Sequence, residues 1–205
     1  MRYSLRPLTS AQDLQRFKSE YEQNVARRSS NQLRLSLPYD YLASSRTMGF
    51  FDREGTLVAG YVLRNAPEFR CLRAIPAEVR ASSQVLRDIP EHDLSELTCI
   101  WRNRGISQAS FGAVGWPRII FDCMVSGRKY ILGLGFDNKA NDMYGVAAPE
   151  LLYEGRSAAP ETQANVHIYL FSRARLAANF AVNFVSRMPG RVRSGRLEAA
   201  QREAR

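Results

Sequence analysis

The clearest helical pattern lies near the N-terminus, where four apolar residues recur at spacings of three, four and four: Leu14, Phe17, Tyr21 and Val25. These spacings place the four side chains on one face of a helix, which predicts that this face packs against a core. Thr9 or Ser10 can cap the start of the helix, and Asp13 suits its first turn.

Apolar runs and alternating apolar and polar positions predict seven strands: 2–8, 48–51, 57–63, 94–101, 129–136, 151–153 and 166–171. The second and third form a hairpin, because Asp52–Gly55 has the composition of a turn. In the strand 94–101, alternation places Leu94, Glu96, Thr98 and Ile100 on one face and Ser95, Leu97, Cys99 and Trp101 on the other.

The remaining helices are predicted less directly. A short helix is expected at 78–87, another after Asp137, and a last one that carries Leu176, Phe180 and Phe184. Gly112, Gly115 and Pro117 weaken the region after residue 107, so the regular helix there is expected to begin at Trp116 or Pro117 and to end near Ser126. The mixture of strands and helices along the chain predicts an α/β domain in the broad sense, with a mixed α+β arrangement.

Composition and charge narrow the class of protein. The 205 residues suit one domain, which we place at 1–188, with 189–205 as a basic tail. The net charge is +9, but residues 186–205 hold six arginines and two glutamates and so carry +4 of it. The remaining net charge of +5 is compatible with binding of a phosphorylated cofactor, an acidic carrier protein or a nucleic acid. Nucleic acid is the least favoured partner, because the tail lacks interleaved aromatic residues.

Other composition features exclude some classes. No apolar run approaches the roughly 20 residues that span a bilayer, and no signal peptide is recognisable, so a cytoplasmic location is expected. The three cysteines and two histidines show no metal-ligand spacing, so no metal is expected. Cys99, Cys123 and His167 lie in apolar patterns and are interpreted as structural residues.

A basic turn at 102–107 follows the strand 94–101 and precedes a helical region, an arrangement that can hold a phosphate group at free backbone N–H groups. The turn reads Arg102-x-x-Gly105-x-Ser107. It resembles the [RQ]-x-x-G-x-[GA] motif with which the GNAT acyltransferases hold the pyrophosphate of coenzyme A, except that serine replaces the final small residue. The Ser107 hydroxyl could cap the following helix or bond a phosphate oxygen.

The order of elements over residues 1–171 also resembles the GNAT fold, a mostly antiparallel twisted sheet flanked by helices, here with an added C-terminal helix. The resemblance implies direct transfer of an acyl group from acetyl-CoA or another acyl-CoA to an amine. It implies an asparagine near the fourth helix that contacts the cofactor, matched by Asn138, and a tyrosine that protonates the leaving thiolate, matched by Tyr144. The expected cofactor-binding residues are Cys99, Ile100, Trp101, Arg102, Arg104, Gly105, Ile106, Ser107 and Asn138.

Glu96 is the candidate base that deprotonates the amine, directly or through water; the alternative is a solvated carboxylate. The alternative to a catalytic role for Tyr144 is a structural one, as an aromatic ring in the core or at an interface. Tyr39 and Tyr41 belong to a segment that either covers the substrate or is an ordinary surface connection. One of Arg102 and Arg104 is expected to bind phosphate while the other is solvated.

The stretch 96–102 is similar to the homoserine-lactone and N-acyl amino acid synthases, which implies acyl carrier protein as an alternative donor and partner. A non-catalytic binding module with the same fold is a further alternative, and a homodimer is compatible with the sequence.

Overall fold

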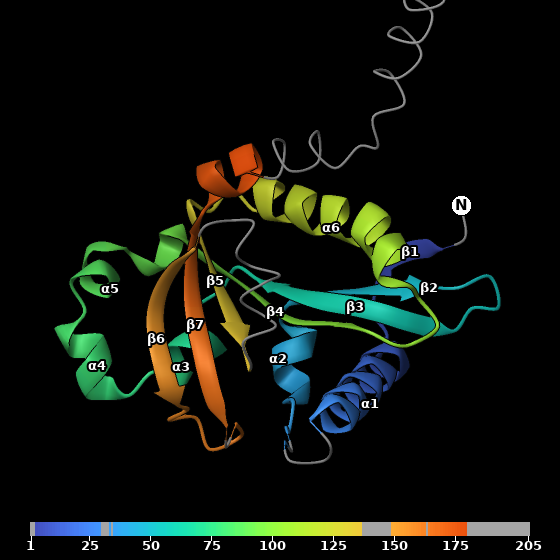
Figure 1. The fold of residues 1–205 in the computed structure, drawn as a ribbon, viewed down its shortest axis with the longest axis horizontal. Coiled ribbons are helices and arrows are strands. Elements are labelled where there is room, and N and C mark those ends of the chain that lie inside the picture. The colour runs from blue at the N-terminus through green and yellow to red at the C-terminus, as the bar shows by residue number, and fades with distance from the viewer. Residues whose placement is uncertain (1–2, 30–32, 34, 137–148, 163, 180–205) are drawn as a thin grey trace, which may run out of the picture.

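The computed structural model describes residues 3–29, 33, 35–136, 149–162 and 164–179. Within them, seven strands form one sheet in the order β1-β2-β3-β4-β5-β7-β6. All neighbours are antiparallel except β4 and β5, which are parallel (Figure 1). The strands are β1 (Ser4–Pro7), β2 (Arg46–Phe51), β3 (Leu57–Arg64), β4 (Leu94–Arg102), β5 (Tyr130–Gly135), β6 (Glu150–Arg156) and β7 (Asn165–Ser172).

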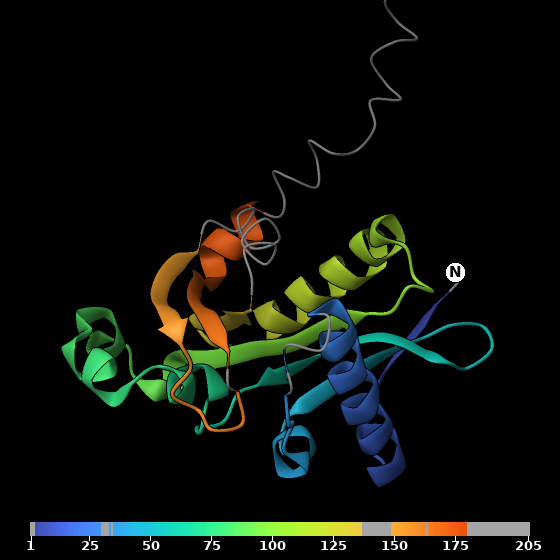
Figure 2. The ribbon, with the colours of Figure 1, turned by 60° about the horizontal axis from the view of Figure 1, so that its bottom comes forward.

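Helices cover both faces of the sheet, as Figure 2 shows from a second direction. The described helices are α1 (Ala11–Arg28), α2 (Tyr39–Ala43), α3 (Arg70–Ala74), α4 (Ala77–Ser82), α5 (Gln84–Asp88) and α6 (Gln108–Val125), with a 3-10 turn η1 (Glu91–Asp93) and a helical stretch at 173–179. The helix α6 lies on one face, and α1 and α2 lie on the opposite face.

Each face has its own core. On the α6 side the apolar layer includes Phe50, Leu97 and Phe111, all buried. On the α1 side it includes Phe17 and Trp101, whose rings meet edge to face with centroids 6.0 Å apart. A third cluster packs α3 against β4, β5 and β7. The central strands β2, β3, β4, β5 and β7 are therefore mostly buried, whereas the edge strands β1 and β6 are more exposed.

The prediction of α1 is confirmed in detail. The helix begins after Ser10, whose hydroxyl accepts a hydrogen bond from the Asp13 N–H at 3.0 Å. Leu14, Phe17 and Tyr21 are buried as their spacing predicted. The hairpin is also confirmed, since Gly55 adopts a φ of +76° in the turn between β2 and β3.

The predicted late start of α6 is wrong. The helix begins at Gln108, directly after the Ser107 cap, and runs through Pro117 to Val125. Packing against the sheet outweighs the weak propensity, because Phe111, Ile119 and Cys123 are buried. Gly115 is required, since a Cβ there would lie 2.7 Å from the Phe111 ring.

Two further predictions are corrected. The single helix expected at 78–87 is two short helices, α4 and α5, because Ser83 is extended and caps α5. The strand expected at 151–153 is longer, since β6 runs from Glu150 to Arg156. The helix expected after Asp137 and most of the last predicted helix lie outside the described residues.

Candidate active site

The candidate site forms where β4 and β5 part. The two strands pair only over Leu94–Leu97 and Tyr130–Gly133. Beyond Leu97, within the described residues, β4 keeps β3 as its only strand neighbour, while β5 continues against β7 alone. Among the strands that the structure describes, none pairs with the second edge of Thr98–Arg102, and this edge is able to bind an extended ligand through hydrogen bonds.

A β-bulge marks the same place. Gly60 of β3 lies opposite Trp101 and Val62 opposite Thr98, so β4 has one extra residue between these pairs. Cys99 has a φ of +52°, which is unfavourable for a residue other than glycine. Bulges and strained residues of this kind concentrate at functional sites, where they redirect backbone and side chains.

The bulge corrects the predicted faces of β4. Thr98 and Cys99 both face α1 and α2, and Ile100 is moved to the α6 side, where it packs against the core that includes Leu97. Simple alternation is wrong after Thr98 because the extra residue shifts its phase by one. Trp101 consequently shares a face with Glu96 and Thr98.

Glu96 lies at the centre of a buried hydrogen-bond network rather than in solvent. Its side chain has 0% exposure. The Tyr41 hydroxyl donates to Oε1 at 2.5 Å, and the Cys71 backbone N–H donates to Oε2 at 2.5 Å. Tyr41 is also 2.7 Å from the Thr98 hydroxyl. The hydroxyls of Thr98 and Tyr41 thus connect the bulge to the buried carboxylate.

Burial raises the pKa of Glu96 above its ordinary value, and the hydrogen bonds from Cys71 and Tyr41 and the positive charge of Arg70 oppose this rise. The pKa of Tyr41 is raised well above its ordinary value by burial first and then by the charge of Glu96. A carboxylate with a raised pKa is suited to general-base chemistry, and burial is the cause of the rise here.

Two arginines flank the Tyr41 ring. The Cζ atoms of Arg64 and Arg70 lie 5.4 and 5.3 Å from the ring centroid. Arg64 donates to the Pro67 carbonyl and to the hydroxyls of Ser44 and Ser45. Among the described residues, Arg70 makes neither a hydrogen bond nor a salt bridge.

The turn between β4 and α6 is short, as its sequence indicated. Arg102 closes it, because its NH1 donates to the Ile106 carbonyl at 3.0 Å. The Asn103 side chain accepts from the Gly105 N–H at 2.8 Å. The Ser107 hydroxyl accepts from the Ser110 N–H at 3.0 Å, so it caps α6, one of the two roles that the sequence left open. Within the described part, the backbone N–H groups of Ile106 and Ala109 have no hydrogen-bond partner.

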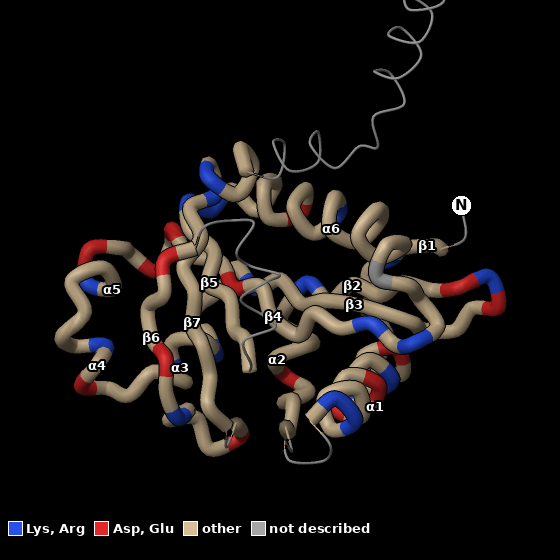
Figure 3. Tube along the Cα trace, in the orientation of Figure 1, with Lys and Arg blue, Asp and Glu red and all other residues tan. Residues whose placement is uncertain are grey.

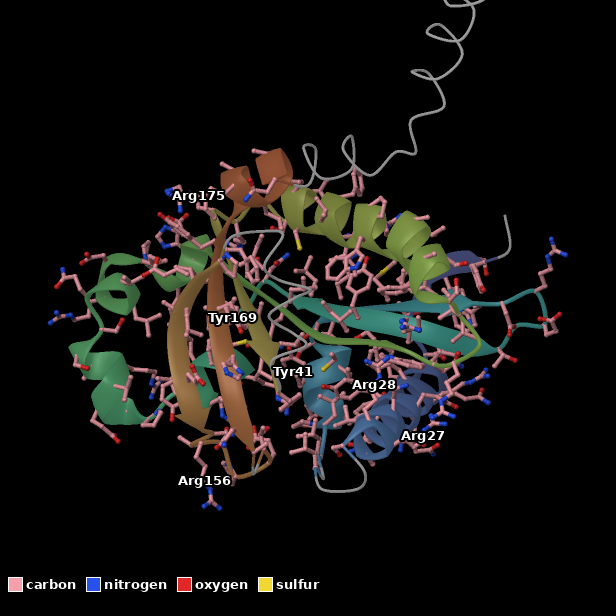
Figure 4. The ribbon with its side chains drawn as sticks, viewed as in Figure 1. Arg27, Arg28, Tyr41, Arg156, Tyr169 and Arg175 are labelled. Atoms are coloured by element: carbon pink, nitrogen blue, oxygen red, sulfur yellow. The ribbon has the colours of Figure 1, made fainter. Side chains whose placement is uncertain are left out.

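Arginines from the end of α1 gather beside this turn (Figures 3 and 4). Asn24 and Arg28 both donate to the Arg102 carbonyl, at 2.9 and 3.3 Å. Arg27 lies next to Arg28 on the helix, and Arg104 is exposed on the turn. We call Arg27, Arg28, Arg102 and Arg104 the basic surface.

The structure brings most of the predicted site residues together. Glu96 and Tyr41 are in contact, but Tyr41 is buried on α2 rather than placed on an exposed covering loop, because its ring fills the space beneath β4. Tyr39 is partly exposed on the same helix. Asn138 and Tyr144 lie outside the described residues. Cys99 and Trp101 are buried in the core, so only their backbone can meet a ligand at the edge of β4.

Other features bear on other classes of site. The described residues contain no group of three or more histidine, cysteine, aspartate or glutamate side chains that could hold a metal ion. None of the described helices has both the length and the apolar character needed to cross a membrane.

No protein-family model and no curated protein sequence matches this chain. Solved structures do match it. FeeM, an N-acyl amino acid synthase from uncultured soil microbes, has a TM-score of 0.68 at 12% identity, over 87% of this chain and 94% of that one. The ribosomal-protein-S18-alanine N-acetyltransferase from Escherichia coli has a TM-score of 0.53 at 9% identity, over 83% and 93%.

The chain has the GNAT fold. TofI, at a TM-score of 0.58 and 12% identity, matches over 88% of this chain and 97% of that one. Near-complete coverage on both sides means that the seven-stranded sheet and its flanking helices correspond to the GNAT fold as a whole rather than to a fragment. At these identities the likeness establishes the fold alone.

Sequence reasoning missed two members of the site. Thr98 could have been found, because it lies two residues after Glu96 and therefore on the same face of a strand. Arg70 gave no usable signal, since its position depends on α3, a five-residue helix with no periodic pattern.

Proposed function

We propose that this protein is an acyltransferase that moves an acyl group from a coenzyme A thioester to the amine of a small-molecule acceptor. The observation that carries the proposal is the bulge at Cys99, at the point where β4 leaves β5. The bulge turns backbone groups of β4 away from regular pairing, which gives donors that can polarise a thioester carbonyl. The fold supports the same reaction class.

The donor would bind along the free edge of Thr98–Arg102, with its pyrophosphate at the turn. The N–H group of the exposed Ala109 and the start of α6 suit a phosphate. Arg104 is the side chain that we assign to the phosphates, because it is exposed and unpaired within the described residues. Arg102 is assigned to closing the turn, since its guanidinium is bonded to Ile106.

The proton path begins at the acceptor ammonium, which transfers a proton to the Thr98 hydroxyl oxygen. Thr98 passes its own proton to Tyr41, and Tyr41 passes its proton to Glu96 Oε1, along contacts of 2.7 and 2.5 Å. The relay replaces direct contact with Glu96, because that carboxylate is fully buried. The neutral amine then attacks the carbonyl carbon, a C–N bond forms, the nitrogen loses its remaining extra proton to water, and the C–S bond breaks to release the amide and a thiolate. Tyr144 remains the proposed acid that protonates it.

Acyl transfer from a carrier protein is the alternative donor chemistry. The basic surface favours it, since four arginines around the turn would attract an acidic partner. The likeness to FeeM points the same way and makes an N-acyl synthase the alternative activity.

Calorimetry with coenzyme A, acetyl-CoA and longer acyl-CoAs tests the donor, and release of free thiol in the presence of amines tests the transfer. We expect Arg104→Ala to weaken donor binding about tenfold, in line with the loss of a charged phosphate contact. Arg53→Ala, an exposed arginine on the β2–β3 turn, is the matched control. If none of these coenzyme A compounds binds, the proposal that a coenzyme A thioester is the acyl donor is refuted. The same thiol assay with acyl carrier protein would then separate the synthase from a non-catalytic module.

A further inference from the structure

The outer face of α6 is apolar at its C-terminal end, where a helix that covers a sheet ordinarily presents polar residues to solvent. Met124 and Val125 lie three and four residues after Phe121, so the three side chains share one face of the helix, opposite the buried Ile119 and Cys123. Phe121 and Val125 are each 55% exposed, and Met124 is 36% exposed. They are three of the five large apolar side chains exposed among the described residues, so this exposure is concentrated rather than scattered. We call these three residues the apolar patch.

Basic residues gather where α6 ends (Figure 3). Lys129 follows shortly after the helix and pairs with Asp93 at 2.8 Å. Its carbonyl accepts a hydrogen bond from the Arg173 N–H at 2.9 Å, which brings the helical stretch after β7 to this end of α6 (Figure 1). Leu176 of that stretch packs against the core on the α6 side of the sheet. Arg175 lies one residue before Leu176 and is exposed at the same end of the molecule (Figure 4).

Arg118 adds a cation on α6 itself, and carboxylates offset the positive charge of this end only in part. The Cζ of Arg118 lies 5.7 Å from the centroid of the Phe121 ring. Arg118 shares the Asp122 carboxylate with Arg46, at 3.1 Å each, so one negative charge faces two positive ones. The arginines near this end of α6 that form no salt bridge with another described residue are Arg128, Arg173 and Arg175. The apolar patch is therefore bordered by net positive charge.

We propose that the apolar patch and the cations around it dock the protein on the surface of an anionic lipid bilayer, with the apolar side chains inserted at the depth of the headgroups. Apolar residues bordered by cations match the apolar and anionic layers of such a surface. A protein partner is the poorer match, because three side chains expose far less than the about 800 Å² per partner that a standard protein interface buries. A bilayer needs no complementary shape, and each basic residue adds its own attraction to the lipids. The inference goes beyond the proposed acyl transfer and does not rest on it.

Cosedimentation of the full chain with lipid vesicles tests the proposal. The vesicles are phosphatidylcholine alone, or phosphatidylcholine with about a quarter of phosphatidylglycerol. We expect binding to the anionic vesicles that weakens as salt is added, and binding to the neutral vesicles that is about tenfold weaker. Phe121→Gln should weaken binding to the anionic vesicles about tenfold, because the apolar ring no longer inserts. Arg173→Gln and Arg175→Gln should each weaken it about fivefold, because each removes one attraction to the lipids.

Tyr39→Gln and Arg53→Gln are the matched controls. Tyr39 is an exposed ring on α2, on the opposite face of the sheet from α6, and Arg53 is an exposed arginine on the β2–β3 turn. Both variants should bind the vesicles as the parent chain does, and circular dichroism should show every variant folded. Phe121→Trp gives a local signal, because its fluorescence should move to a shorter wavelength on the anionic vesicles as the ring leaves water. Tyr39→Trp should show no such shift.

Three results would overturn the proposal. The first is the absence of binding to the anionic vesicles. The second is binding that survives Phe121→Gln combined with Arg173→Gln and Arg175→Gln, which would place the lipid contact on another part of the chain, such as the arginine-rich segment 186–205. The third is a dimer, seen by light scattering without lipid and abolished by Phe121→Gln, in a chain that binds no vesicles. That result would assign the apolar patch to a second copy of the chain.

Discussion

Replacing Tyr41 by phenylalanine tests the buried network most directly. The change removes one hydroxyl and leaves the ring, so the packing between Arg64 and Arg70 is retained. What is lost is the 2.5 Å hydrogen bond to the Glu96 carboxylate and the 2.7 Å contact with Thr98. A hydrogen bond to a charged group contributes about 1.5–3 kcal/mol, and a buried partner left unsatisfied raises the cost. We expect a loss of about 2–3 kcal/mol, or roughly 4–12 °C in melting temperature for a chain of this size.

The loss should depend on pH. Burial raises the pKa of Glu96 in the folded state above its unfolded value. The stability from this group is therefore fully present below the unfolded pKa and is lost as the pH rises through the folded pKa. The Tyr41 hydrogen bond lowers the folded pKa, so its removal raises that pKa further. Tyr41→Phe should consequently be more destabilised at pH 8.5 than at pH 5.

Urea unfolding at both pH values measures the effect, and Tyr39→Phe is the matched control. Tyr39 loses the same hydroxyl from the same helix, but its side chain is partly exposed and has no hydrogen bond in the described region. The same variants test the relay. If Glu96 accepts the proton, kcat/KM rises with pH through its raised pKa, and Tyr41→Phe lowers the rate and moves that rise to higher pH. Destabilisation equal to that of Tyr39→Phe, or the same at both pH values, would refute the reasoning.

Three further predictions concern the scaffold, and urea unfolding followed by circular dichroism checks each of them. Gly60→Ala should be strongly destabilising, because its Cβ would lie 2.5 Å from a backbone oxygen of β2. In Gly112→Ala the Cβ meets no atom within 4 Å, so this variant should stabilise α6 by about 0.5–1 kcal/mol. Similar stability changes in the two variants would contradict this prediction. Asp122→Ala should cost at least about 2 kcal/mol, because this fully buried carboxylate bonds a tyrosine and two arginines, and Asp93→Ala, on an exposed ion pair, should cost much less. Ser107→Ala should cost about 1 kcal/mol through the lost helix cap, and an unchanged stability would argue against that cap.

The sequence was sufficient for elements whose local signals agree with the fold. In α1 the cap at Ser10 and the apolar face indicate the same helix, so its limits and its core residues were predictable. In α6 they conflict: Pro117 and two glycines argue against a helix that tertiary packing nevertheless forms. Propensity is a weak local preference, and burial of Phe111 and Ile119 against the sheet exceeds it.

The candidate site was predictable in part. Glu96 and the turn at Arg102–Ser107 could be identified from residue type and position, but their surroundings could not. The burial of Glu96 depends on Tyr41 and Cys71, which lie 55 and 25 residues away in the chain. Nothing local encodes such contacts, so the choice between a solvated and a buried carboxylate required the fold.

In the proposed function, the bulge at Cys99 lets one strand face both substrates. An uninterrupted β4 would alternate strictly, and Thr98 and Cys99 would face opposite sides of the sheet. The extra residue instead turns both toward α1 and α2, while Ile100 returns to the α6 side. In the proposed reaction, the backbone of this short stretch contacts the thioester, and the Thr98 hydroxyl contacts the amine. A one-residue deletion that removes the bulge should therefore impair donor binding and the proton relay together, whereas Arg104→Ala should weaken donor binding alone and Tyr41→Phe should impair the relay alone. If the deletion weakened donor binding in calorimetry and left the pH dependence of kcat/KM unchanged, the bulge would not couple the donor site to the relay.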